Sequence, residues 1–73
     1  MGYRSKEFYE AKYPKGTIVE LTEAIDDPYT PKPVGARFKV NFVDDALQLH
    51  GCWLSPNRGS MAIDIEHDEF RIV

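Results

Sequence analysis

The side chains best suited to chemistry in this 73-residue chain are a histidine and a cysteine two positions apart, His50 and Cys52. Positions two apart on a strand face the same way, so the imidazole and the thiol would lie side by side. Two ligands do not make a zinc site, and a cysteine nucleophile needs a base that a third group orients. The sequence offers no such third group beside His50. We therefore predict that the protein is not an enzyme and uses no metal and no cofactor.

Adjacent aspartates occur twice, at Asp26-Asp27 and at Asp44-Asp45. The first pair precedes Pro28 and Tyr29, so this loop could present an acidic and aromatic surface to an extended peptide. Aspartate side chains also cap backbone amides in turns, and this role is favoured for the first pair. The second pair lacks further oxygen ligands at calcium spacing, so a hairpin turn is the preferred interpretation there.

Three other groups of side chains could form contacts, and each has a simpler explanation. Trp53 could be a stacking platform, although a tryptophan in a small domain is more often part of the core. Arg37, Lys39 and Arg58 could meet a phosphate or an acidic partner, and solvation of an outer strand face is the default. An acidic run surrounds His67 and is favoured as a solvated edge over a contact patch; it consists of Asp64, Glu66, Asp68 and Glu69.

Composition narrows the classes of partner. The chain carries 9 Lys+Arg and 12 Asp+Glu, for a net charge of −3; residues 1–15 have a net charge of +2 (four basic, two acidic) and residues 16–73 a net charge of −5 (five basic, ten acidic). An acidic body lacks the electrostatic footprint of a nucleic-acid binder, so nucleic acid is disfavoured as a partner. A single cysteine excludes an intramolecular disulfide. The polar start and the absence of a long apolar run predict a cytoplasmic protein with no membrane contact.

The element that must position these side chains is a predicted β-hairpin over residues 34–54. Phe38, Val40 and Phe42 alternate with polar residues, and the same period of two continues from Leu47 to Trp53. Alternation on both sides of an aspartate-rich turn at 44–46 is typical of a half-buried antiparallel hairpin.

The rest of the chain is expected to complete a core on the inner face of this hairpin. A helix over residues 5–12, with Ser5 as its N-cap, is too short to be stable alone and must dock. We further expect strands at 17–22, 60–65 and 70–73, a proline-rich loop at 23–33, a turn at 55–59 and one helical turn at 66–69.

These elements predict a mainly β fold, a small five-stranded SH3-like barrel at residues 16–73, with a short N-terminal helical segment at residues 1–15. Because so small a core is only marginally stabilising, we expect either a docked helix or a homodimer contact. The side chains predicted to point inward are Val19, Leu21, Phe38, Val40, Phe42, Leu49, Trp53, Met61, Ile63, Phe70 and Ile72.

Four blocks of the sequence resemble one known family: YPKGTIVEL, DDPYTPKPVGA, FVDDALQLHGCW, and GSMAI with the later DEFRI. The resemblance is to the domain-of-unknown-function family forty-three-fourteen, a small SH3-like domain of bacteria, phages and mobile elements. It implies a phage or mobile-element origin, and therefore the cytoplasm of a host cell, and brings no catalytic residues. The chain has Phe38 and Leu47 where that family usually has Gly, and Gly51 where a β-branched residue is common. Phe38 and Gly51 are interpreted as a compensating pair on facing strands.

Together these observations predict a non-enzymatic interaction module that binds a host or phage protein. Several alternatives stay open. The protein could be a phage counter-defence protein that inhibits a host immune protein or sequesters a nucleotide signal, a nucleic-acid-binding SH3-like module, or a structural domain of a larger assembly; a homodimer also stays open. The binding residues we expect are Asp27, Tyr29 and Lys32 of the proline-rich loop, with Arg37, Lys39 and His50 of the hairpin.

Overall fold

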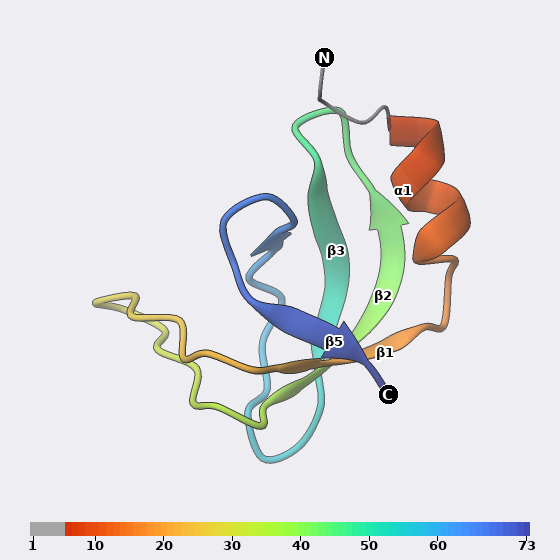
Figure 1. Ribbon diagram of the computed structural model, residues 1–73. Helices are drawn as coiled ribbons and strands as arrows, with labels where there is room; N and C mark the ends of the chain where they lie inside the picture. The colour runs from red at the N-terminus through yellow and green to blue at the C-terminus, as the bar shows by residue number, and fades with distance from the viewer. Residues whose placement is uncertain (1–5) are drawn as a thin grey trace.

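The computed structural model describes residues 6–73 as a curved antiparallel sheet with a short helix packed beside it (Figure 1). The strand order within the sheet is β4-β3-β2-β1-β5. Within the described residues β4 and β5 are not paired with each other, so the sheet is not closed by strand pairing. No helix in this part of the chain is long and apolar enough to span a bilayer. The elements are α1 Lys6–Lys12, β1 Ile18–Leu21, β2 Arg37–Val43, β3 Gln48–Trp53, β4 Ile63–Asp64 and β5 Phe70–Ile72.

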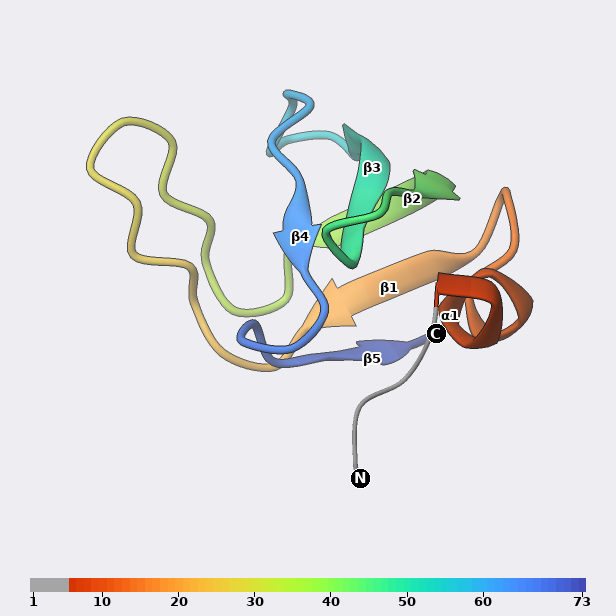
Figure 2. The same ribbon diagram turned by 90° about the horizontal axis from the view of Figure 1, so that it is seen from above.

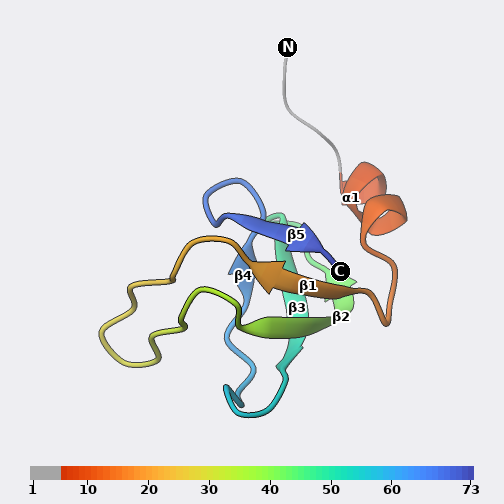
Figure 3. The same ribbon diagram turned by 60° about the horizontal axis from the view of Figure 1, so that its bottom comes forward.

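The sheet bends so strongly that its two halves face each other across the core. Figure 3 shows β5, β1 and β2 side by side, with β3 and β4 crossing behind them. Val19 of β1 and Leu49 of β3 are fully buried between these halves. Glu20 alternates to the outer face, where it pairs with Arg37 of β2 and with Arg71 of β5. The predicted alternation of β1 is thus confirmed, because one face of each strand supplies the core.

A β-bulge in the central hairpin changes which side chains face the core. The register of β2 against β3 shifts between Val40 and Phe42, so Val43 is buried while Phe42 is 51% exposed. The prediction that Phe42 points inward is wrong because one extra residue reverses the alternation beyond it.

Gly51 is explained by close backbone approach at the bulge. It lies opposite Val40, and a Cβ atom on Gly51 would overlap the carbonyl oxygen of Lys39. Phe38 instead lies opposite Trp53, with ring centroids 5.0 Å apart. The interpretation of Phe38 and Gly51 as a compensating pair is therefore wrong.

The hairpin turn is held by Asp44, as the turn interpretation of this residue predicts. Its Oδ1 accepts hydrogen bonds from the backbone N–H groups of Ala46 (2.9 Å) and Gln48 (3.0 Å). The N–H of Leu47 donates to the carbonyl of Asp44, and Leu47 has φ 58°. A leucine therefore stands in the left-handed conformation that glycine adopts at lower cost.

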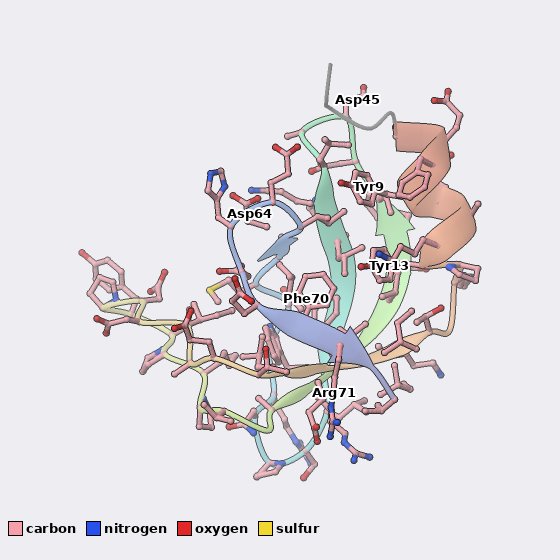
Figure 4. The ribbon with its side chains drawn as sticks, in the orientation of Figure 1. Tyr9, Tyr13, Asp45, Asp64, Phe70 and Arg71 are labelled. Atoms are coloured by element: carbon pink, nitrogen blue, oxygen red, sulfur yellow. The ribbon has the colours of Figure 1, made fainter. Side chains whose placement is uncertain are left out.

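The helix docks on the sheet through one tyrosine face. The rings of Tyr9 and Tyr13 are stacked with centroids 6.3 Å apart, and Tyr13 lies 5.5 Å from the ring of Phe70 (Figure 4). Tyr13 is only 7% exposed and belongs to the core. The predicted docking is confirmed, while the proposed N-cap Ser5 lies outside the described residues.

The remaining predicted strands are shorter than expected. Ile63 is buried, but Ile72 at the edge of the sheet is 50% exposed, so the assignment of Ile72 to the core is wrong.

Between β4 and β5 the carbonyl of Asp64 accepts hydrogen bonds from the backbone N–H groups of His67 and Asp68, and the N–H of Asp64 donates to the Asp68 carboxylate (2.8 Å). The helical turn expected at residues 66–69 is therefore a hydrogen-bonded turn that begins at Asp64, not a helix.

Residues 23–33, called the arm below, project from the sheet on the side away from α1 (Figure 2). Ile25 and Lys32 exchange two backbone hydrogen bonds of 2.9 and 3.0 Å near its base. At its tip the Asp27 carboxylate accepts the N–H groups of Tyr29 (2.7 Å) and Thr30 (2.9 Å). The capping role predicted for this aspartate pair is confirmed for Asp27.

Candidate functional site

The outer face of the hairpin carries an open depression of about 560 Å³, called the hairpin groove below. It lies at the bulge, where the twist and bend of β2 hollow the strand surface. Of the residues predicted to bind, Lys39 and His50 line it. The full lining is Lys15, Lys39, Val40, Asn41, Phe42, His50, Gly51, Cys52 and Ser60.

A rigid aromatic pair lines one side of the groove. Phe42 and His50 stack with centroids 4.7 Å apart and an interplanar angle of 3°. The Nε2 atom of His50 lies 2.6 Å from the Asp44 Oδ2 atom. This hydrogen bond, with those from the backbone amides of the turn, lowers the pKa of Asp44 below its ordinary value. The turn and the groove are therefore joined through one carboxylate, which also fixes the His50 ring.

Two lysines give the groove a local positive charge. Neither Lys15 nor Lys39 forms an ion pair with another residue in the described range 6–73. Among the described residues no carboxylate lines the depression. In a chain of net charge −3, this places uncompensated cations around an exposed phenylalanine.

The groove continues beyond Phe42 toward α1. A second depression of about 260 Å³ lies there, and it shares Lys15, Asn41 and Phe42 with the hairpin groove. Tyr13, Pro14 and Glu10 form part of its wall, and the Glu10 carboxylate is ion-paired with Lys6 (3.9 Å). The two depressions together form an elongated surface, which suits an extended chain better than a compact ligand.

The other predicted binding residues lie elsewhere. Lys32 is 7% exposed, and its Nζ atom lies 5.4 Å from the centroid of the Trp53 ring, so it packs the arm onto the core. Trp53 is itself 3% exposed and donates its indole N–H to the carbonyl of Met61. Asp27 and Tyr29 lie on the arm, where the tyrosine is 89% exposed. The structure therefore separates the loop residues from the groove.

Arg37 belongs to an ionic network on the outer face of β1, β2 and β5. Glu20 accepts a hydrogen bond from Arg37 (3.3 Å) and hydrogen bonds from Arg71 of 2.8 and 3.1 Å. Figure 4 shows Arg71 extending from the outer side of β5. The guanidinium groups of Arg71 and then Arg37 lower the pKa of Glu20. Arg37 is thus already engaged with a carboxylate, unlike Lys39.

The acidic run near the C-terminus forms local contacts. His67 lies 2.8 Å from Asp64 through Nδ1, and this hydrogen bond raises the pKa of His67 above its ordinary value.

His50 and Cys52 both line the groove, as their spacing indicates. Within residues 6–73 no group of three or more potential ligands could hold a metal ion.

Sequence reasoning missed three groove residues of importance, Lys15, Phe42 and Ser60. Lys15 follows α1 and Ser60 follows the turn after β3, so only the fold brings them to the hairpin. For Phe42 a signal existed in Gly51, because a glycine inside a strand pattern indicates a bulge or close backbone approach.

Comparison with known proteins bears on this domain as a whole. No curated protein and no solved structure matches the chain. A family model described as a domain of unknown function, DUF4314, matches residues 5–73, nearly the whole sequence. The chain therefore belongs to the DUF4314 family.

Proposed function

We propose that this protein is a non-enzymatic interaction module that binds an acidic, extended segment of a host or phage protein in the hairpin groove. The observation that carries the proposal is the placement of Lys15 and Lys39, both without ionic partners in the described chain, beside the exposed ring of Phe42. Lysines at a rim steer and orient an acidic partner, and the aromatic ring supplies apolar contact area.

The strand order supports a comparison with SH3-like barrels, and we assign the fold to that class. An antiparallel sheet of order β4-β3-β2-β1-β5, bent around one core, has the expected succession of neighbouring strands. SH3 domains hold extended peptides against aromatic side chains. The elongated surface on both sides of Phe42 has the shape for such a segment.

The stacked Phe42–His50 pair also favours a second candidate, the capture of a nucleotide signal. A base could stack on the aromatic surface while Lys15 and Lys39 meet the phosphates. The groove is open to solvent, so a nucleotide would be enclosed only by a second subunit. We rank this candidate below peptide binding because an open and elongated surface fits an extended chain.

Fluorescence anisotropy with a labelled peptide rich in Asp, Glu and Tyr tests the proposal. At low salt we expect saturable binding that the variant Lys39→Glu weakens by about tenfold or more. The matched control is Arg58→Glu, which makes the same change of charge at an exposed turn residue outside the groove. Equal affinities for both variants, or no binding by the wild type, would refute the proposal. If a nucleoside triphosphate displaces the peptide and binds the groove more tightly than the peptide does, the second candidate is favoured.

A further inference from the structure

The arm has the chemistry that the hairpin groove accepts. Its acidic side chains are Glu23, Asp26 and Asp27, and its one basic side chain, Lys32, is buried against Trp53. At its tip Tyr29 is 89% exposed, more than the other large hydrophobic side chains of the described surface. An acidic strip with one projecting aromatic ring is the complement of two lysines beside Phe42.

The arm is organised before any partner arrives. Asp27 holds the tip through the backbone amides of Tyr29 and Thr30, and Ile25 and Lys32 are joined by two backbone hydrogen bonds. The Thr30 hydroxyl lies 3.0 Å from the sulfur of Met61, which ties the arm to the core. A ligand loop that is already ordered loses less conformational entropy on binding.

We propose that the arm of a second copy of this chain is a ligand of the hairpin groove, with Tyr29 against the Phe42–His50 pair and the acidic residues beside Lys15 and Lys39. This inference rests on the proposed function, since it uses the same groove. It adds that copies of the chain associate with one another and that an external acidic segment competes with the arm.

In this fold the tip of the arm projects away from the sheet and from the α1 side of its own groove, as all three ribbon views show (Figures 1, 2 and 3). The groove extends from Ser60, next to the Met61 that the arm contacts, to Lys15, which lies three residues after α1. Reaching across would break the Ile25–Lys32 pairing and withdraw Lys32 from Trp53. The contact is therefore between copies, and either a reciprocal dimer or a chain of subunits satisfies it.

Sedimentation velocity over a wide range of protein concentration tests the inference. We expect reversible association that weakens as salt is raised, because charged side chains at the surface are screened. The variants Tyr29→Ala, Asp26→Lys and Lys39→Glu should each raise the dissociation constant by about tenfold or more. An equimolar mixture of Asp26→Lys with Lys39→Glu should associate again, because the lysine of one arm then meets the glutamate of the other groove.

Two matched controls reverse charge outside both surfaces, Glu69→Lys for the arm and Arg58→Glu for the groove, and should associate like the wild type. Circular dichroism confirms that each variant is folded. A wild type that stays monomeric at every concentration would overturn the inference, and so would association that the arm and groove variants leave unchanged.

The result also separates this inference from the proposed function. If the labelled acidic peptide binds through Lys39 while the protein remains monomeric, the proposed function stands and the arm proposal falls. If copies associate through the arm and Lys39 but no external peptide binds, the groove is a contact between copies only, and the proposed function falls.

Discussion

Gly51 lies opposite Val40 across the central hairpin, at the point where β2 carries one more residue than β3. This pairing determines the outer surface of the domain. The backbone of β2 passes so close to Gly51 that no Cβ atom fits, and the bulge turns Phe42 outward beside His50. The hairpin groove exists because of this local departure from regular pairing.

Substitution of Gly51 by alanine should destabilise the protein by about 1–3 kcal/mol, the usual cost of overpacking, since the added methyl group meets backbone that cannot move aside freely. Urea unfolding followed by tryptophan fluorescence measures the change. Cys52→Ala is the control, because the neighbouring side chain is exposed and its removal should change the free energy of unfolding by less than about 0.5 kcal/mol. A Gly51→Ala protein as stable as the wild type would show that the strands do not approach so closely.

The left-handed conformation of Leu47 predicts how this turn responds to side-chain shape. Leu47→Ile keeps the volume but adds branching at Cβ, so it should lower the free energy of unfolding by about 1–2 kcal/mol. Leu47→Asn should cost less, because asparagine tolerates positive φ. Thermal unfolding of the two variants compares them. If the isoleucine variant is the more stable of the two, the turn does not have this conformation.

The two phenylalanines of β2 should behave differently on truncation. Phe38 is fully buried, so Phe38→Ala should cost about 3–5 kcal/mol. Phe42 is half exposed, so Phe42→Ala should cost about 1 kcal/mol or less, yet it should weaken peptide binding in the groove. Urea unfolding and peptide titration of both variants provide the measurements. A large loss of stability on truncating Phe42 would contradict the bulge.

The His67–Asp64 pair predicts a pH effect of known sign. Asp64 stabilises protonated His67, so the pKa of His67 is raised above its ordinary value of 6.5. The contribution of this pair to stability is then fully present below that ordinary value and is lost as the pH rises through the raised pKa. An NMR titration of the ring protons should show the raised pKa, and Asp64→Asn should bring it down toward the ordinary value. The ring protons of His50, followed in the same spectra, serve as a control: a change at His50 in the Asp64→Asn variant would show that the substitution acts beyond the His67–Asp64 pair.

The elements predicted most closely are those that depend on local pattern. Alternation predicted the hairpin and the buried face of β1, and Asp27 and Asp44 cap backbone amides as turn aspartates do. The predicted helix corresponds to α1 over the described residues 6–12. These predictions were accurate because each feature depends on residues only a few positions away in the chain.

The sequence by itself thus determined the position of the hairpin, the position and apolar face of β1, and the turns held by Asp27 and Asp44. Only the tertiary structure decided that Phe42 faces outward, that Lys15 joins it from the segment after α1, and that Lys32 is buried against Trp53. These outcomes depend on contacts between residues far apart in the chain, and a one-residue bulge shifts every later side chain to the opposite face. The alternation of apolar and polar residues within one strand does not indicate where the backbone of the neighbouring strand approaches it closely.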